Sequence, residues 1–462
     1  MLMLILSMVL VMDARMLTLQ RRTSMYSMIV LALVLTYPGY RRLLGMNQLW
    51  NPGFYQVTMR MMEENPGQFR RLYRMTPQTF LSLESDLWAS MYRTAPSLAE
   101  LNSPDPTVAD RAKKRRWSGW RGPHPEPTVF RFRLLVTIYF LANGCTYSGL
   151  AVAFGMTLDW RDMFVAQLAA LKTATVRWPS EMGTRAEITA AFAACPLPHG
   201  VPAGIISGLL GCIDGTFIRI LRPLSQRRNP QAWNSYKKFY AVQCLAVCGA
   251  NFLFYFFEAG RPGSWTDSCM LERTLLFRLA QVFVPAGFYL FGDAGFGQFR
   301  WLMTPFTKPQ LKRKAGQGGV AGRPYRKAVL YNDAQASARV HIEQAFGILK
   351  NRWQVLKLVR TRLDKVPSVV YACVVLHNYC ILEQDIWETP DPDQTNARAN
   401  NAPDREVWGH SPQPRLPKWA TECPTVPVQG MVPPTTNAYH SKPLGATERE
   451  RLVDKIWVSV HG

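Results

Sequence analysis

The stretch GCIDGTFIRI, residues 211–220, places one acidic residue, Asp214, inside a run that otherwise reads as a buried β-strand. An unpaired carboxylate is costly to bury, so its presence in such a strand favours a functional site. The stretch YLFGDAGF, residues 289–296, repeats this pattern and puts Asp293 at the end of another strand. The two aspartates therefore become candidates for one shared site.

A third carboxylate, Glu343, lies in HIEQAFGILKNRW, residues 341–353, on the rim of an apolar helical stripe. The stripe consists of Ile342, Phe346, Leu349, Trp353 and Leu356. Together, Asp214, Asp293 and Glu343 predict a divalent-metal site for phosphodiester chemistry. Each has a structural alternative: Asp-Gly at 214 also favours a hairpin turn, the glycines around Asp293 could form an ordinary turn after a strand, and Glu343 could pair with Arg339 one turn earlier.

Other polar residues in this half of the chain are weaker candidates. Asp267 is a possible fourth metal-ligating carboxylate, although a role in the N-cap region of a helix would explain it equally well. His341 lies about 200° from Glu343 around the helix, so it cannot easily share a ligand face. His377 and Asn378 stand in an apolar helix and are predicted to be hydrogen-bonded core residues.

Composition and charge narrow the class of protein. The chain has 462 residues, 48% of them hydrophobic, which is enough for sizeable cores and excludes a disordered protein. The net charge of +22 favours a polyanionic partner such as nucleic acid, with an anionic membrane surface as the alternative. The nine cysteines show neither CxxC pairs nor zinc-finger spacing, and they read as reduced core thiols.

The predicted fold is α/β, with a mixed-sheet domain over 205–385 preceded by a helical region over 66–200. Three strands near 212–220, 239–249 and 251–260 form a meander, followed by a helix over 264–281 and a fourth strand before Asp293. The N-terminal helices include one capped by Thr76 and Pro77, and a helix-turn-helix-like unit over 130–172. Asp159 and Asp162 make the second helix of that unit a poor DNA-reading helix.

The ends and linkers carry less information. Segment 1–65 is apolar in part, but its apolar runs at 1–12 and 28–35 are too short to span a bilayer, and a mis-assigned start explains them better than a signal peptide. A Pro-rich linker over 101–128 holds a basic cluster that could serve nuclear import. Its residues are Arg111, Lys113, Lys114, Arg115 and Arg116. The tail over 386–462 is predicted to be mostly disordered, with a capping box at Thr447 opening a short terminal helix.

Several cations are candidates for contacts with a DNA backbone. A stretch over 308–327 holds seven Lys or Arg and no acid, and its glycines predict a mobile loop, either solvated or clamping DNA. The candidate residues are Arg339, Lys350, Lys237, Lys238, Lys312, Arg313 and Lys314.

Six segments in order resemble PIF/Harbinger-type transposases and the nucleases derived from them. They are GCIDGTFI, WNSYKKFYAVQCLAVC, GSWTDS, LFGDAGF with WLMTPF, HIEQAFGILKNRW and VVLHNYC. The resemblance covers about residues 66–385 and implies a ribonuclease H-like fold with Asp214, Asp293 and Glu343 as the DDE triad. It departs from the family pattern at Thr266, where the family usually has histidine.

The resemblance also implies a mechanism and partners. Two Mg²⁺ or Mn²⁺ ions would activate water or a DNA 3′-hydroxyl for cleavage or joining of DNA. The expected partners are DNA and a separate Myb-like DNA-binding protein, with a homo-oligomer as an open option, no membrane, and a nuclear location after synthesis in the cytoplasm. Two other classes stay open: a domesticated, catalytically silent DNA-binding scaffold, and a sugar hydrolase with two carboxylates.

Overall fold

The computed structural model describes residues 52–92, 96–109, 126–146, 149–150, 154, 161–197, 201–202, 204–223, 229–387 and 442–461. The chain divides into two compact units, one made of 1–65 and 145–161 and the other of 66–144 and 162–462. In the first unit the described part includes helix α4 (Pro52–Glu64). The basic cluster at 111–116, most of the 1–65 segment and the first helix of the helix-turn-helix-like unit lie outside the described residues.

The second unit opens with helices whose ends follow local sequence signals. The first two helices are α5 (Pro66–Tyr73) and α6 (Pro77–Met91), separated at Arg74, which has a left-handed φ of 60°. Thr76 caps α6 as predicted, because its Oγ1 accepts a hydrogen bond of 3.2 Å from Thr79 N. Helix α9 (Pro127–Asn143) ends at Gly144 with φ 65°, the glycine stop that the sequence indicates. The further helices here are α7 (Leu98–Leu101), α11 (Arg161–Ala170), α12 (Lys172–Thr175) and α13 (Met182–Ala193).

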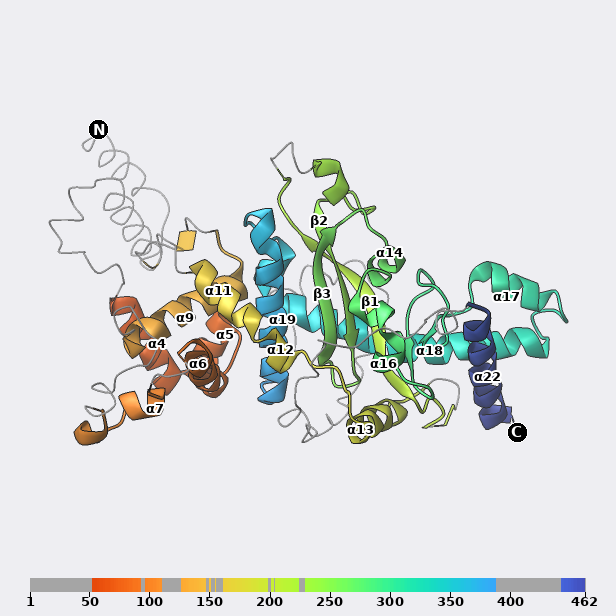
Figure 1. The fold of residues 1–462 in the computed structure, drawn as a ribbon, viewed down its shortest axis with the longest axis horizontal. Helices are drawn as coiled ribbons and strands as arrows, with labels where there is room; N and C mark the ends of the chain where they lie inside the picture. The colour runs from red at the N-terminus through yellow and green to blue at the C-terminus, as the bar shows by residue number, and fades with distance from the viewer. Residues whose placement is uncertain are drawn as a thin grey trace, which may run out of the picture. The chain divides into compact units, whose positions relative to one another are not determined.

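A five-stranded mixed sheet forms the centre of this unit, with the order β3-β2-β1-β4-β5 (Figure 1). Its strands are β1 (Leu209–Arg219), β2 (Ala241–Cys248), β3 (Phe254–Pro262), β4 (Tyr289–Phe291) and β5 (Leu302–Met303). The first three are antiparallel neighbours, and β4 and β5 continue the sheet parallel to β1. The predicted meander and the mixed α/β class are confirmed. Strand β5 was not predicted, because two residues carry no alternation of polar and apolar side chains.

Two long helices pack on the sheet and complete the core. Helix α18 (Arg323–Arg352) buries the stripe predicted from its periodicity, including Ile342 and Leu349. Helix α19 (Val366–Leu382) packs against β3 and α12. The overlapping stretch Leu363–Leu382 is apolar and long enough to cross a membrane by composition, but 67% of it is buried inside the protein. That burial is typical of a core helix.

The polar residues of α19 confirm the prediction that they are satisfied within the core. Asn378 Oδ1 accepts from Phe254 N at 3.0 Å, and its Nδ2 donates to Phe254 O at 2.8 Å and to Thr175 O at 2.9 Å. His377 Nε2 lies 2.9 Å from Phe252 O, and burial lowers the pKa of this histidine to about 4. Both side chains therefore tie α19 to the edge of the sheet.

Three predictions of local structure were wrong in detail. The single helix expected over 264–281 is three short ones, because Thr274 starts a new turn by accepting from Phe277 N at 3.2 Å. They are α14 (Asp267–Leu271), α15 (Leu275–Arg278) and α16 (Ala280–Phe283). The segment expected as a mobile loop begins with α17 (Lys308–Ala315), opened by a capping box between Thr307 and Gln310.

The C-terminal helix is also longer than predicted. Helix α22 (Lys442–His461) begins five residues before Thr447, which lies inside it and is not its N-cap. It lies beside α18 and β5 (Figure 1), and Lys327 pairs with Asp454 across this contact. Tertiary packing therefore sets where this helix begins. The remaining short helices are η2 (Pro230–Trp233), η3 (Gln354–Lys357) and η4 (Leu363–Lys365).

Candidate metal centre

The register of two parallel strands brings Asp214 and Asp293 together. The last pair between β1 and β4 joins Cys212 to Phe291, and each aspartate follows two residues later on its own strand path. Because β1 and β4 run parallel, and each aspartate lies two residues beyond the last pair, both carboxylates lie side by side just beyond the C-terminal end of β4. Asp214 lies inside β1 and pairs with Ala246 of β2, which excludes the hairpin-turn alternative for this residue.

A third carboxylate, Asp267, reaches this edge from the first turn of α14. Thr266 is the N-cap of that helix, since its Oγ1 accepts from Cys269 N at 3.2 Å. The Asp267 side chain is therefore not needed as the cap, and it lies directly over Gly215. A β-carbon at Gly215 would stand 1.7 Å from Asp267 Oδ1, so only glycine permits this approach. Gln243 Nε2 donates a hydrogen bond to the same carboxylate oxygen.

The carboxylates of Asp214, Asp267 and Asp293 form one cluster, here called the aspartate cluster. Each offers an oxygen within 4.8 Å of the other two, and all three side chains are partly buried. The pKa of Asp267 is raised to about 6, mainly by burial and in addition by the charges of Asp214 and Asp293, while Gln243 and Lys237 oppose the rise. Burial also raises the pKa of Asp214. Such mutual repulsion calls for a positive charge at the cluster.

Backbone amides fix two of these carboxylates. Gly215 N donates to Asp214 Oδ1 at 2.8 Å, and Gly295 N donates to Asp293 Oδ1 at 2.9 Å. Each bond uses one carboxylate oxygen, Oδ1, and the Oδ2 of Asp214 is paired with Arg339 at 3.3 Å. The glycines of GDAG therefore help to orient Asp293 instead of merely forming a turn.

Glu343 stands beside the aspartate cluster and not within it. Its side chain is 62% exposed, and Arg339 lies between it and Asp214, 4.0 Å from Glu343 Oε1 and 3.3 Å from Asp214 Oδ2. The ion pair expected between Arg339 and Glu343 is thus present, and Arg339 also serves Asp214. Glu343 is near enough for its charge to raise the pKa of Asp214. The structure brings Asp214 and Asp293 of the predicted triad together. The third residue, Glu343, is separated from Asp214 by Arg339, which pairs with both.

The aspartate cluster fits a hard divalent cation. Mg²⁺ takes oxygen ligands at about 2.0–2.1 Å, so two ligands on one ion lie at most about 4 Å apart, and the three carboxylate oxygens here lie within 4.8 Å of one another. Gln243 Oε1, next to Asp267, is a buried acceptor without a hydrogen-bond partner among the described residues. It could accept from a water on a bound ion. The donor set, the repulsion and this unused acceptor all agree with a metal ion.

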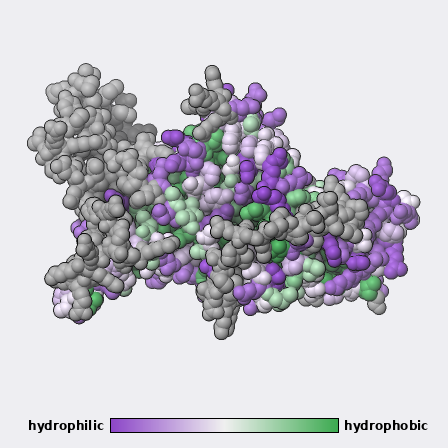
Figure 2. Space-filling view, in the orientation of Figure 1, coloured by the Kyte–Doolittle hydropathy of each residue, from purple (hydrophilic) through white to green (hydrophobic). Residues whose placement is uncertain are grey.

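The other cations predicted to contact DNA fall into two groups. Lys237 and Lys238 are exposed on the segment between η2 and β2, and Lys312 and Arg313 are exposed on α17. Figure 2 shows hydrophilic residues covering the end of the molecule where α17 lies. These four residues could reach a ligand without rearrangement.

The second group is engaged within the protein. Lys350 Nζ donates to Thr216 Oγ1 at 2.6 Å and to Phe217 O at 3.1 Å. Lys314 Nζ lies 3.1 Å from Glu450 of α22. Both would need to leave these partners before contacting a phosphate.

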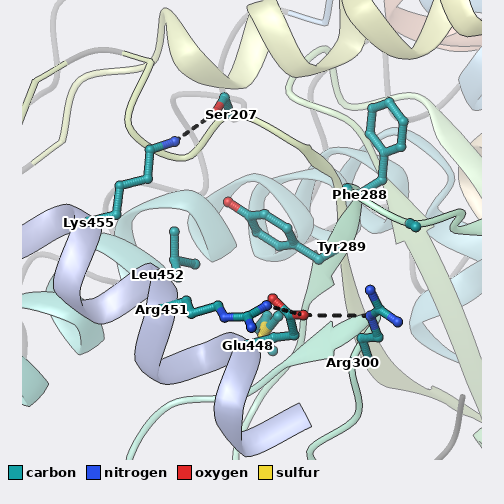
Figure 3. A pocket seen from close by; sticks show the side chains of 11 residues that line it. Ser207, Phe288, Tyr289, Arg300, Glu448, Arg451, Leu452 and Lys455 are labelled. Atoms are coloured by element: carbon teal, nitrogen blue, oxygen red, sulfur yellow. Dashed lines mark hydrogen bonds and ion pairs between the residues drawn. The ribbon is translucent and has the colours of Figure 1, made fainter. Parts of the chain in front are cut away.

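A separate cavity of about 210 Å³ lies between α22 and β4, away from the aspartate cluster (Figure 3). Glu448 bridges two cations there, Arg451 at 3.0 Å and Arg300 at 3.6 Å, and Lys455 Nζ donates to Ser207 Oγ at 3.0 Å. These contacts fasten α22 to the rest of the unit. The cavity thus belongs to the docking of the C-terminal helix.

Comparison with known proteins places this geometry in a family. Residues 213–378, which include all members of the aspartate cluster and Glu343, match the family described as DDE superfamily endonuclease. Over these residues the chain is similar to the DDE superfamily endonucleases, and this segment is called the DDE domain below. This match and the relatives below confirm the resemblance to Harbinger-derived proteins.

The relatives match this chain at modest identity. "Protein ALP1-like" of Arabidopsis thaliana is 26% identical over 283 residues, 56% of this chain and 62% of that protein. "Putative nuclease HARBI1" of Mus musculus is 26% identical over 190 residues, 40% of this chain and 50% of that protein. The chain therefore spans between half and two thirds of the length of these relatives. No solved structure gives a significant match.

Sequence reasoning undervalued two residues of this DDE domain. Asp267 was predicted to be a possible fourth metal-ligating carboxylate, with a role at the helix start as an equal alternative, yet Thr266 directly before it is the better capping residue and leaves Asp267 for the site. Gln243 carried no local signal, because its role depends on how β2 pairs with β1. Contacts between distant segments decide both cases.

Proposed function

We propose that this DDE domain cuts DNA phosphodiester bonds with a divalent metal ion, Mg²⁺ or Mn²⁺, held by the aspartate cluster. The observation that carries the proposal is the convergence of Asp214, Asp267 and Asp293 within 4.8 Å, inside the segment that matches DDE endonucleases. A sugar hydrolase would need only two carboxylates, at least about 5 Å apart. Three carboxylates in closer contact favour phosphodiester chemistry.

A ribonuclease H-like fold is the architecture that this proposal assigns to the sheet. The order β3-β2-β1-β4-β5, with β1 to β3 antiparallel and β4 and β5 parallel to β1, supports it. In this arrangement the first and fourth strands deliver Asp214 and Asp293 to one edge. Helix α18 supplies Glu343 from the side.

Each residue of the site has a distinct task in the proposed reaction. Asp293 would hold the metal with Oδ2, Asp214 would do so with the Oδ2 that now pairs with Arg339, and Asp267, oriented by Gln243, would complete the set. A bound divalent ion would supply activation of water or of a 3′-hydroxyl and stabilisation of the leaving oxygen. Arg339 offsets the charge of Asp214 and is placed to attract a phosphate group.

Glu343 has two tasks open to it. It could join the metal ligands once substrate draws Arg339 away, which is the role that the family resemblance implies. Otherwise it serves only to orient Arg339 through the 4.0 Å ion pair. Activity of Glu343→Gln separates the two, since loss of a ligand removes cleavage whereas loss of a surface pair is worth only a few tenths of a kcal/mol.

DNA is the proposed substrate, and the charge of the chain supports this choice. The net charge of +22 and the exposed cations of α17 suit a polyanion. We further propose that sequence recognition comes from a separate Myb-like DNA-binding protein and that the chain acts in the nucleus. Solution measurements of the chain's mass would show whether it self-associates. A domesticated scaffold that binds DNA without cutting it is the second candidate.

The experiment is nicking of supercoiled plasmid DNA by the purified chain with Mg²⁺, Mn²⁺ or EDTA. Wild-type protein should nick DNA only with metal, and Asp214→Asn, Asp267→Asn and Asp293→Asn should not nick it above background. Glu343→Gln should also lose nicking if Glu343 is a metal ligand, and should keep most of it if Glu343 only orients Arg339. Glu272→Gln, at the exposed C-cap of α14, is the matched control and should cut at the wild-type rate. Metal-independent nicking, or binding without nicking, would reject the proposal, and binding alone would favour the scaffold.

A further inference from the structure

An exposed turn lies close to the aspartate cluster, between η2 and β2. Ser235 closes it, because Ser235 N and Oγ each donate to Phe239 O at 2.9 Å. Lys238 N donates back to Ser235 O at 2.9 Å, and Lys238 takes a left-handed φ of 64°. Asn234 and Tyr240 pair at the base of the turn. The tip, Tyr236 to Lys238, is therefore held in a defined shape by its own backbone.

The tip displays an aromatic ring that the fold does not bury. Tyr236 is 75% exposed and meets the edge of Phe217 at 5.5 Å, with the two planes 66° apart. Lys237 Nζ lies 5.6 Å from the Tyr236 ring and 5.9 Å from the Phe217 ring. An exposed aromatic ring flanked by cations is the arrangement by which proteins stack nucleic-acid bases and hold their phosphates.

The turn sits on the same face of the sheet as Asp267. Phe217 lies two residues after Gly215 on β1, so both point to the face that Asp267 covers. Ser264 N donates to Ala232 O at 3.1 Å, which joins the segment before α14 to the base of the turn. The charge of Lys237 is close enough to lower the pKa of Asp267. A strand bound at the aspartate cluster would pass within reach of this tip.

We propose that Tyr236 and Lys237 hold an unpaired nucleotide of the DNA strand beside the bond to be cut. Tyr236 stacks on the base, and Lys237 contacts the adjoining phosphate. The inference rests on the proposed function and adds to it a preference for DNA whose bases are already unpaired near the cut. A fully paired duplex must first free that base, which costs a few kcal/mol.

The test compares binding of the full chain to a paired duplex and to the same duplex with a short mismatched bubble. Both carry a 2-aminopurine base in the bubble position, and Ca²⁺ replaces Mg²⁺ so that the DNA stays intact. Wild-type protein should bind the bubble more tightly and quench the 2-aminopurine. Tyr236→Ala should lose about tenfold in bubble affinity and lose the quenching, whereas Tyr236→Phe should keep both.

Two further variants separate stacking from charge and from general surface effects. Lys237→Gln should weaken binding to both duplexes and lower the salt slope by about 0.9 on paired DNA. Leu221→Ala, a change at another side chain that is 54% exposed, should behave as wild type. Equal binding of the two duplexes by wild-type protein, or full bubble affinity in Tyr236→Ala, would overturn the inference.

The same protein preparation, assayed for nicking with Mg²⁺, keeps the two proposals apart. Nicking without bubble preference would reject only the role of Tyr236. Bubble preference without nicking would reject the proposed cleavage and retain the nucleotide-binding turn. Absence of both DNA binding and nicking would reject both.

Discussion

Replacing Asp267 with asparagine should stabilise the metal-free protein at neutral pH. The folded state raises the pKa of Asp267 from 3.8 to about 6, which corresponds to at most about 3 kcal/mol of cost for the ionised group. Because this side chain is only partly buried, solvent screening reduces the expected gain to about 1–2 kcal/mol. Asparagine keeps an acceptor for Gln243 Nε2 but removes the charge.

The pH dependence of this gain follows from linkage. A carboxyl whose pKa is raised on folding does not lower the free energy of unfolding well below pH 3.8, where the folded and unfolded states both hold the proton. The cost grows as pH rises, since the unfolded chain releases the proton first, and it is complete above about pH 6. The difference between Asp267→Asn and wild type should therefore be largest at neutral pH and fall to about half a kcal/mol or less near pH 4.

Urea unfolding in EDTA, at neutral pH and near pH 4, measures the effect, with Glu272→Gln as the control that shifts neither midpoint. Repeating it with Mn²⁺ should reverse the order, because the ion stabilises wild type by RT ln(1 + [L]/Kd) and the variant lacks a ligand. Equal or lower stability of Asp267→Asn in EDTA at neutral pH would refute the repulsion argument. Unchanged Mn²⁺ stabilisation of the variant would remove Asp267 from the metal site.

Three other changes test the remaining features. Arg339→Gln should slow metal-dependent nicking by at least about tenfold, because the neutral residue no longer draws a phosphate to the site, and initial rates at saturating metal would show it. Replacing Lys312 and Arg313 with glutamine should lower the slope of log K against log salt by about 0.9 for each lost phosphate contact, whereas an unchanged slope would leave α17 out of binding. Asn378→Ala leaves the backbone groups of Phe254 unpaired, so the free energy of unfolding should fall by about 2–4 kcal/mol in urea titrations.

The sequence predicted the sheet well because its strands carry strong local signals. Runs such as 241–248 are apolar at every position except Gln243, and the structure buries every residue of β2. The short β5 and the break of 264–281 into three helices escaped prediction, since a two-residue strand and a capping threonine inside an apolar run look ordinary locally. Long periodic patterns survive into the fold, whereas short elements depend on their neighbours.

The site was predictable in composition but not in arrangement. Helical spacing placed Glu343 on the rim of its buried stripe, and the structure agrees, with the side chain exposed. Spacing cannot say how far a rim residue stands from Asp214, because that distance depends on how α18 lies on the sheet. Nor could it show that Arg339 reaches Asp214 at 3.3 Å. The convergence of Asp267 likewise needed Gly215 and the β1–β2 pairing.

The strand pairing around Asp214 divides the aspartate cluster into a fixed and an adjustable part. Strand β1 is the middle strand of the sheet, so its amides should exchange with solvent slowest in this unit. Asp267 belongs to a five-residue helix, and Asp293 belongs to a loop. Ions of different radius would be accommodated by shifts of α14 and of that loop, while β1 keeps its position. The relative affinities of the protein for Mg²⁺, Mn²⁺ and Ca²⁺ would then depend on how easily α14 and the loop that holds Asp293 move.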